Sequence, residues 1–373
     1  MKIKQFSQQG KRSNNEDSLG HSAGLITVCD GIGGHVSGER ASAFVVEAMT
    51  RAFQEPAAIG KMEIQQQLNQ VQTDLNQLLD QEPELEKMGT TFTGIFRTPD
   101  VWFAAHIGDS RIYLFRPSER KLWHTWDHSL VGELMRTKEI TVEAGRFHPM
   151  SNRIEKAIIA QRDGKPANAS IVRIDQLKPG DVFLLCSDGV IEAWGDLELV
   201  KLFSDTNRSF EDKCKALQQQ CDERSKDNNT AIIVEIEEAD AFDYGDNDEL
   251  TWTTFDEVEA DFNQYLKDSG AATEKAVEEE KSQPEPTMEM EKKPQVGKPV
   301  STVRKDKPKN ARRWLLLIAA VLFVAALALF LLLRGGNTSG DGTAVEPTPQ
   351  QNPQPNIESP ARFVPRSSTP MPK

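Results

Sequence analysis

The sequence predicts an α+β fold in which β-sheets are flanked by helices, followed by a C-terminal region of different character. Short apolar runs separated by turn residues recur between residues 25 and 236, which is typical of strands. Two longer stretches among them have apolar residues at helical spacing. The last third of the 373 residues is charged or rich in proline, apart from one uncharged run. The globular domain is therefore predicted to span residues 1–238.

The predicted elements follow in order along this domain. The predicted strands are Leu25–Cys29, Thr90–Phe96, Val101–Ile107, Ile112–Phe115, Val182–Cys186 and Ala231–Ile236. The predicted helices are Glu39–Phe53 and Met62–Leu79. Many strands joined by turns, together with two long helices, favour sheets covered by helices. The pattern leaves the strand order open.

The C-terminal region divides into a linker, an apolar segment and a tail. Residues 239–313 are first acidic and then basic, so we expect a linker, with a candidate short helix at 250–266 where aromatic residues recur three and four apart. Residues 314–333 are twenty apolar residues without a charge. At about 1.5 Å per residue they span the roughly 30 Å hydrocarbon core, so we expect a transmembrane helix. Residues 334–373 are Pro/Ser/Thr-rich and are predicted to be disordered.

Flanking charges predict the orientation of this span. Nine Lys or Arg lie between residues 292 and 313, whereas only Arg334 follows the span closely. With this one span, we expect a single-pass protein of the cell (inner or cytoplasmic) membrane, and the positive-inside rule gives its orientation. The globular domain faces the cytoplasm, and the tail is extracytoplasmic.

Charge and cysteine content narrow the class of protein. Residues 235–280 hold 17 Asp or Glu against 2 Lys, a net charge of −15, while the whole chain carries −13. The remainder is near neutral and has no basic stripe with interleaved aromatics in its first 240 residues, so we expect no nucleic-acid partner. The four cysteines show neither zinc-site nor disulfide-framework spacing, which favours a reducing compartment.

Four acidic motifs indicate the chemistry. They are Arg12-Ser13-Asn14-Asn15-Glu16-Asp17, Asp30-Gly31-Ile32-Gly33-Gly34-His35, Ser187-Asp188-Gly189 and Asp227-Asn228. Carboxylates that a fold gathers repel one another and need a cation, and an all-oxygen ligand set is the type preferred by Mg²⁺ or Mn²⁺. An Arg beside such a cluster is placed to meet an anionic substrate, above all phosphate. The motifs therefore predict metal-assisted chemistry on a phosphate.

With further motifs in the same order, these residues resemble the metal-dependent Ser/Thr protein phosphatases of the PPM/PP2C type, in their bacterial form. The resemblance extends to about residue 237. The further motifs are Met88-Gly89-Thr90-Thr91, Gly108-Asp109-Ser110-Arg111 and Asp127-His128-Ser129-Leu130-Val131. It implies a PP2C-like α/β/β/α sandwich of two mostly antiparallel sheets flanked by helices.

The resemblance also implies metal ligands. Asp30 matches the residue that bridges two Mn²⁺ or Mg²⁺ ions, and Gly31 matches one that offers its carbonyl. By the same match, Asp188 and Asp227 complete the ligand set of the first metal. Asp109 suggests a third, weaker metal shared with Asp188.

The remaining implied roles concern the second metal and the substrate. Glu16 and Asp17 match the acidic pair at the second metal or its water shell, and Arg12 matches the residue that holds the substrate phosphate. The implied activity is that of a protein-serine/threonine phosphatase, a phosphoric monoester hydrolase in which a water bridging two ions attacks phosphoserine or phosphothreonine. Its implied partners are phosphorylated proteins and a Ser/Thr kinase that it opposes.

The resemblance is incomplete in two places. Eukaryotic members carry a His two residues after the bridging Asp, where this chain has Ile32. His35 is therefore a candidate proton donor, with a structural role in the Gly-rich loop as the equal alternative. The stretch from about 126 to 160 resembles the family's flap subdomain but has Arg136–Glu139 in place of a glycine-containing turn, and His128 is interpreted there as capping a turn.

Two alternatives remain open on sequence alone. The chain is either an active phosphatase or a catalytically weak pseudophosphatase that binds phosphoproteins as a membrane scaffold. In a further reading, the extracytoplasmic Pro-rich tail binds cell-wall material or a partner, which is compatible with the phosphatase role.

Overall fold

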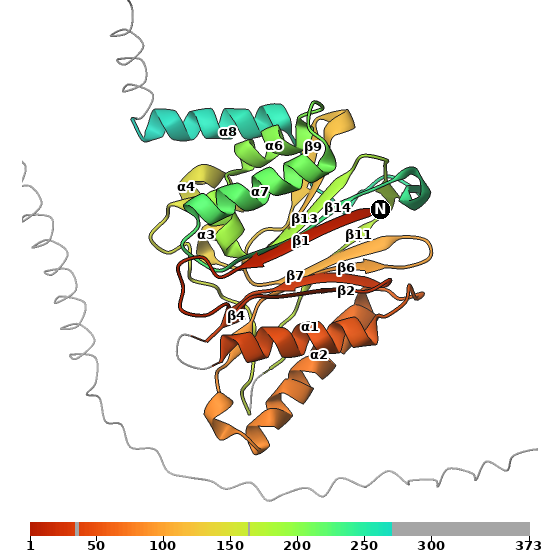
Figure 1. The fold of residues 1–373 in the computed structure, drawn as a ribbon, viewed down its shortest axis with the longest axis vertical. Coiled ribbons are helices and arrows are strands. Elements are labelled where there is room, and N and C mark those ends of the chain that lie inside the picture. The colour runs from red at the N-terminus through yellow and green to blue at the C-terminus, as the bar shows by residue number, and fades with distance from the viewer. Residues whose placement is uncertain (34–36, 163–164, 271–373) are drawn as a thin grey trace, which may run out of the picture. The chain divides into compact units, whose positions relative to one another are not determined.

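The computed structural model describes residues 1–33, 37–162 and 165–270, and these ranges contain two antiparallel sheets that face each other. Helices cover the outer face of each sheet, α5–α7 on one side and α1–α2 on the other (Figure 1). This arrangement confirms the predicted α/β/β/α sandwich. The sheet order, which the sequence left open, comes from the pairing of strands far apart in the chain.

The first sheet has the order β1 (Lys2–Gln8), β14 (Asn229–Glu235), β13 (Val182–Cys186), β8 (Arg111–Arg116), β9 (Lys121–His124), β16 (Thr253–Thr254). The second sheet has the order β11 (Ser170–Ile174), β7 (Trp102–Ile107), β6 (Phe92–Arg97), β3 (Leu25–Cys29), β2 (Ser18–His21). Short pairings join β10 (Ile158–Ile159), β5 (Gly89–Thr90) and β4 (Gly31–Ile32), and also β12 (Gln176–Leu177) and β15 (Phe242–Asp243).

The helices are α1 (Gly38–Ala52), α2 (Lys61–Gln77), α3 (Leu130–Arg136), α4 (Val142–Arg146), α5 (Asp188–Ala193), α6 (Asp196–Ser204), α7 (Phe210–Arg224) and α8 (Phe255–Asp268). Short 3₁₀ turns lie at Leu78–Asp80, Pro83–Leu85, Pro117–Glu119 and Glu238–Asp240. The predicted helices Glu39–Phe53 and Met62–Leu79 correspond to α1 and α2. Helix α1 buries Ala41, Val45 and Met49 against the second sheet, as four-residue spacing requires.

Burial on both faces of the strands explains their continuous apolar runs. In β13, Phe183 and Leu185 point into the core between the two sheets, whereas Val182, Leu184 and Cys186 pack under helices. Successive side chains of a strand point to opposite faces, so a strand in a four-layer fold needs apolar residues at every position. This is why β3 and β13 are visible in the sequence without alternation.

Strand β1 is absent from the sequence prediction. Its residues are mostly polar and exposed, and among them Phe6 alone is buried. It lies at the edge of the first sheet and pairs antiparallel with β14 from Lys2↔Glu235 to Gln8↔Asn229. Pairing with a distant strand, rather than local hydrophobicity, holds it in place.

The globular fold continues past residue 238, where the sequence placed the domain end and a linker. Strand β16 pairs with β9, and α8 follows directly, close to the candidate helix at 250–266. Phe255 and Val258 are buried in the helical core, and Trp252 lies over the guanidinium of Arg116 at 4.9 Å. The acidic composition of this segment hides a few apolar anchors that bury it against the domain.

No helix within the described ranges is long and apolar enough to cross a membrane. The predicted span at 314–333, the tail at 334–373 and the part of the linker from 271 to 313 lie outside the described residues.

Candidate active site

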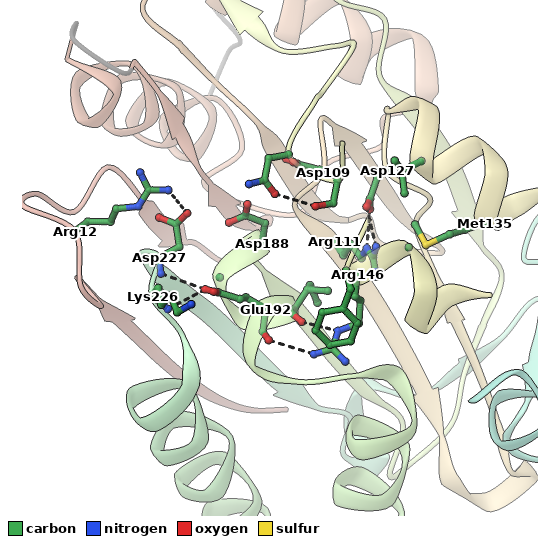
Figure 2. Close-up of a pocket in the computed structure, with 17 residues that line it drawn as sticks. Arg12, Asp109, Arg111, Asp127, Met135, Arg146, Asp188, Glu192, Lys226 and Asp227 are labelled. Carbon is green, nitrogen blue, oxygen red and sulfur yellow. Dashed lines mark hydrogen bonds and ion pairs between the residues drawn. The ribbon is translucent and has the colours of Figure 1, made fainter. Parts of the chain in front are cut away.

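Four aspartates from four distant segments meet at one end of the sandwich. Asp30 follows β3, Asp109 lies two residues after β7, Asp188 begins α5 after β13, and Asp227 lies just before β14. The register of β13 with β14, Cys186↔Ala231, places the end of one strand beside the start of the other. All four line one pocket of about 330 Å³, which we call the acidic pocket. Figure 2 shows Asp188 between Asp109 and Asp227.

Arg12, Glu16 and Gly31 line the same pocket. The structure thus brings together the residues predicted for metal and phosphate binding, with Asp17 directly behind them. Asp17 is buried, and its Oδ2 accepts a 2.7 Å hydrogen bond from Ser187 Oγ beside Asp188. His35 lies outside the described residues, so its predicted role as proton donor stays a prediction.

Backbone contacts hold Asp30 with its carboxylate left for the pocket. Its N–H donates to Thr91 Oγ1 at 2.9 Å, and its carbonyl accepts from Thr91 N and Thr90 Oγ1, both at 2.8 Å. Thr91 Oγ1 also bonds Ser110 Oγ at 2.7 Å, which ties the turn after β3 to the turn after β7. The threonine pair therefore fixes the position of Asp30 relative to Asp109.

Gly31 has a steric requirement as well as a predicted ligand role. A Cβ at this position would lie 2.4 Å from the carbonyl oxygen of Gly38 and 2.5 Å from that of Glu16. Its N–H donates to the Glu16 carbonyl at 3.1 Å. Since no side chain fits between these two backbones, glycine is what allows the Glu16 loop to approach Asp30.

Asn228 fastens the loop that carries Arg12, Glu16 and Asp17. Its Nδ2 donates to the carbonyls of Gln9 and Asn14, each at 2.8 Å, and its Oδ1 accepts from Glu16 N at 2.9 Å. In the sequence, Asn228 is recognisable only as the residue that follows Asp227 in an acidic motif. Its three contacts cross more than two hundred residues of chain, which no local pattern reveals.

Glu192 is a site residue that the sequence reasoning missed. Its carboxylate accepts from Lys226 N at 2.8 Å, Asp227 N at 3.3 Å and Ser225 Oγ at 3.1 Å, so it holds the loop that presents Asp227. It follows Asp188 by four residues on α5 and so lies on the same helix face. That spacing was the available signal.

Electrostatic repulsion among the carboxylates shows in their pKa values. Burial raises the pKa of Asp17 to about 7 and that of Asp188 to about 6, and the negative charge of Asp227 adds to both. Burial and then the charge of Asp188 raise the pKa of Asp30 and Asp109 well above the ordinary range. Each group is harder to ionise because the others crowd it.

Arg12 supplies positive charge at the rim of the pocket. Its guanidinium donates to the Asp227 carboxylate, while 60% of its side chain stays exposed. A guanidinium that is both paired to the cluster and open to solvent is placed to meet an anion that enters the pocket.

The donor set fits a divalent cation of the Mg²⁺ or Mn²⁺ type. All the donors are oxygens, and Asp17 Oδ1 is buried without a hydrogen-bond partner in the described structure. A bound cation would lower the raised pKa values of these carboxyls, because its positive charge favours their ionised form. Among the described residues, no three acidic, histidine or cysteine side chains already form a metal-ligating group.

A second cavity of about 440 Å³ adjoins the acidic pocket (Figure 2). It shares Asp109, Asp188 and Asp227 with that pocket and extends toward α3 and α4, where Met135 and Phe147 form its wall.

His128, interpreted from sequence as a turn cap, accepts from Gly108 N at 3.1 Å and stacks on His106 with ring centroids 4.4 Å apart. Burial lowers the pKa of His128 to about 3, so it is neutral at physiological pH.

Comparison with known proteins identifies the relatives of this chain. Residues 6–232 match the family model for protein phosphatase 2C. The chain is 30% identical over 241 residues to the serine/threonine protein phosphatase PstP of Mycobacterium tuberculosis, covering 63% of this chain and 44% of PstP. It is 29% identical over 239 residues to the serine/threonine phosphatase stp of Listeria innocua, covering 60% of this chain and 91% of that protein.

A solved structure adds a metal to this comparison. The catalytic domain of PstP in complex with two manganese ions superposes with a TM-score of 0.54 at 27% identity, covering 64% of this chain and 98% of that one. The matched part of the present chain spans less than half the length of PstP itself.

Proposed function

This chain belongs to the protein phosphatase 2C family, and we propose that it hydrolyses phosphoserine and phosphothreonine in proteins with Mn²⁺ or Mg²⁺. The observation that carries the proposal is the convergence of Asp30, Asp109, Asp188 and Asp227 on one pocket with Arg12 at its rim. The relatives named serine/threonine phosphatases, and the manganese complex of one of them, support it.

The residues present account for the parts of such a reaction that the protein supplies. Arg12 binds and orients the phosphoryl oxygens with charge-assisted hydrogen bonds. Asp30 and Asp188, with Asp227 and the Glu16–Asp17 pair, would hold the cations, and Thr91, Asn228 and Glu192 keep the loops that bear these ligands in place. When bound, divalent cations stabilise charge on the phosphoryl oxygens and allow water to act as nucleophile at neutral pH.

Cysteine chemistry has no support at the site. Burial raises the pKa of the Cys29 and Cys186 thiols far above neutral pH, so neither is a thiolate nucleophile. Both side chains lie in the hydrophobic cores on either side of the site. The proposed reaction is therefore direct hydrolysis rather than transfer through a cysteine phosphate.

Phosphate release from a phosphothreonine peptide tests the proposal against the scaffold alternative. We expect residues 1–270 and the full-length chain to release phosphate with Mn²⁺ and to stop when EDTA is added. A matched Asp30→Asn variant should bind the peptide without turnover. Peptide binding by the unmodified chain with no release of phosphate at any Mn²⁺ concentration would instead establish the pseudophosphatase.

We further propose that residues 314–333 anchor the phosphatase in the cell membrane, with the domain in the cytoplasm and residues 334–373 outside. The uncharged run of twenty residues and the nine basic residues before it support this topology. A Ser/Thr kinase at the same membrane is the proposed counterpart. Alkaline extraction of membranes should leave the full-length protein in the pellet and release a 1–313 truncation. A reporter enzyme that is active only outside the cytoplasm should be active when it is fused after residue 373.

A further inference from the structure

Helix α8 lies beyond the residues that match the family model, yet it packs onto α4 and α6 of the domain, near the second cavity. In Figure 1 it runs across α6 and toward α4. Its N-terminus is firmly attached, because β16 pairs with β9, Phe255 N donates to the Arg120 carbonyl at 2.9 Å, and the Phe255 and Val258 side chains are buried. An element outside the shared catalytic fold is thus fixed against it.

The C-terminal half of α8 contacts the segment that carries α4. Asp261 Oδ2 accepts a 2.9 Å hydrogen bond from Val142 N, in the first turn of α4. The Tyr265 ring stacks on the Phe147 ring with centroids 6.2 Å apart and planes inclined by 27°. These two contacts join α8 to both ends of α4.

The other side of this segment is a wall of the cavity next to the acidic pocket. Gly145, Arg146 and Phe147 line that cavity together with Asp109 and Asp188. Arg146 donates to the carbonyls of Ile191 at 3.0 Å and Glu192 at 3.2 Å, so the wall is also tied to α5, which bears Asp188.

Phe147 is the feature of this wall that suits a polypeptide. Its side chain is 63% exposed, unusual for a large apolar residue, and its cavity also presents Met135 and Ile191. Lys226 and Asp227 also line this cavity. A phosphorylated residue in the acidic pocket would place the neighbouring residue of its chain over this apolar surface.

We propose that α8 positions the Phe147 wall, and that Asp261 and Tyr265 thereby set how tightly a phosphorylated polypeptide with an apolar residue next to the phosphorylated one is bound. This inference rests on the proposed phosphatase function. The two residues act through α4 and touch neither phosphate nor metal ligands, so they are positioning residues. Small phosphate esters, which do not reach the wall, are indifferent to them.

The test compares two substrates in the full-length protein with Mn²⁺. For a phosphothreonine peptide with a flanking Leu, Tyr265→Ala and Asp261→Ala should each raise KM about three- to tenfold with kcat within twofold. For p-nitrophenyl phosphate both constants should stay at the unmodified values. Tyr265→Phe keeps the stacking ring and Asp261→Asn keeps an acceptor oxygen, so both should restore the peptide KM. Asn263→Ala, an exposed position on the same helix, is the matched control.

Two results would overturn the inference. Equal losses on both substrates would mean that α8 only stabilises the fold, and an unchanged peptide KM in the alanine variants would mean that the wall does not bind the polypeptide. If the unmodified protein hydrolyses neither substrate, the proposed function fails separately. Peptide affinity by fluorescence anisotropy then decides the inference, and it must weaken in Tyr265→Ala and Asp261→Ala but not in Asn263→Ala.

Discussion

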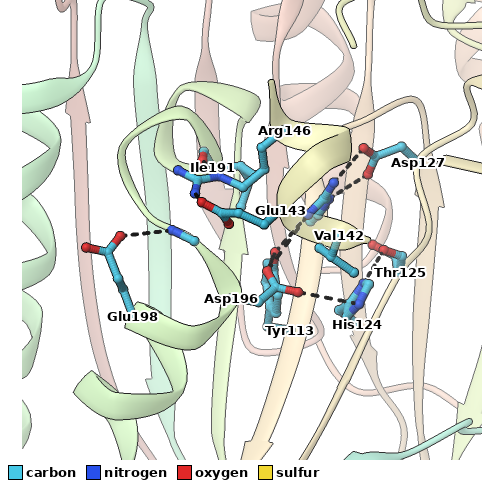
Figure 3. A network of polar contacts seen from close by, with 12 residues as sticks. Tyr113, His124, Thr125, Asp127, Val142, Glu143, Arg146, Ile191, Asp196 and Glu198 are labelled. Carbon is cyan, nitrogen blue, oxygen red and sulfur yellow. Dashed lines mark hydrogen bonds and ion pairs between the residues drawn. The ribbon is translucent and has the colours of Figure 1, made fainter. Parts of the chain in front are cut away.

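Two buried polar regions lie next to each other and are built in opposite ways. In the acidic pocket, Asp30, Asp109 and Asp188 line the same space, and the exposed guanidinium of Arg12 contacts the cluster through Asp227. Around β8, two residues beyond Asp109, each buried charge has a partner (Figure 3). We call this second region the paired network; its members are Arg111, Tyr113, His124, Asp127 and Asp196.

The distances in the paired network are those of satisfied groups. Arg111 donates to both oxygens of Asp127 at 2.6 and 2.7 Å, and to the hydroxyl of Tyr113 at 3.1 Å. Tyr113 in turn donates to Asp196 at 2.9 Å. In the acidic pocket, by contrast, carboxylates crowd each other and their pKa values rise. The paired network therefore stabilises the fold, whereas the acidic pocket weakens it and is explained by what it binds.

The largest expected effect separates activity from stability in the acidic pocket. Asp188→Asn should lower kcat/KM on a phosphopeptide by about 10³-fold or more, equivalent to about 4 kcal/mol of transition-state stabilisation. The midpoint of thermal unfolding in EDTA should stay the same or rise, because one of the mutually repelling charges is gone. A clear drop in that midpoint would show that Asp188 stabilises the fold, and would contradict the conclusion that the acidic pocket weakens it.

A substitution in the paired network should have the opposite effect, lowering stability while activity changes little. Asp196→Ala leaves the Tyr113 hydroxyl and the Arg111 guanidinium short of a buried partner, so the free energy of unfolding should fall by about 3 kcal/mol. Urea denaturation measures this loss, and kcat/KM of the folded fraction should stay within a few fold. Glu82→Ala is the control, since its pair with Arg40 is exposed and its loss should leave the urea midpoint nearly unchanged.

Removal and addition of metal should act on stability through the acidic pocket. A carboxyl whose pKa is higher in the folded than in the unfolded chain binds its proton more tightly when folded, so ionisation lowers stability. For Asp17, with a pKa of about 7, and Asp188, with about 6, this cost is absent below pH 4 and complete above pH 7.

In EDTA, these two groups should therefore make the protein less stable as pH rises from about 4 to about 7. At pH 7.5, Mn²⁺ at about 100 times its dissociation constant should add about 2.7 kcal/mol. Calorimetric scans across this pH range check both expectations. No response of the unfolding temperature to Mn²⁺ would contradict the metal assignment, and Asp188→Asn should reduce the response.

The smallest expected effect concerns Arg12. Arg12→Ala removes charge-assisted hydrogen bonds to phosphate, which we expect to lower kcat/KM about 30-fold, or about 2 kcal/mol. Arg12→Lys should recover part of this, because the charge remains but the fork geometry is lost. Steady-state kinetics with a phosphothreonine peptide distinguish the variants. Equal activity of Arg12→Ala and the unmodified chain would remove Arg12 from the proposed mechanism.

The elements predicted from sequence are those with strong local patterns. Leu25–Cys29 and Val182–Cys186 are observed at their predicted bounds because strands buried on both faces need an apolar residue at every position. Strand β1 was missed because its stability comes from pairing with β14, and α8 was seen only as a candidate helix in a linker. Its four-residue apolar spacing is local, but its docking on α4 is not.

In the candidate site too, the residues predicted from sequence are those with a local signal. Asp30, Asp188 and Asp227 were found because each follows or precedes an apolar run and their order resembles a known family. Glu192 and the role of Asn228 were missed, since each acts on backbone groups that the chain brings near only when folded.

By itself, the sequence determined the chemical kinds of group available, the strands that would be buried, and an oxygen-rich ligand set suited to Mg²⁺ or Mn²⁺. Only the tertiary structure decided which carboxylates meet, which acquire a partner, and that α8 supports the wall beside them. The physical reason is that composition and periodicity are local, whereas burial and charge interactions act between residues more than two hundred positions apart. Asp109 and Arg111 differ by two positions in sequence, yet one joins the unpaired cluster and the other the paired network.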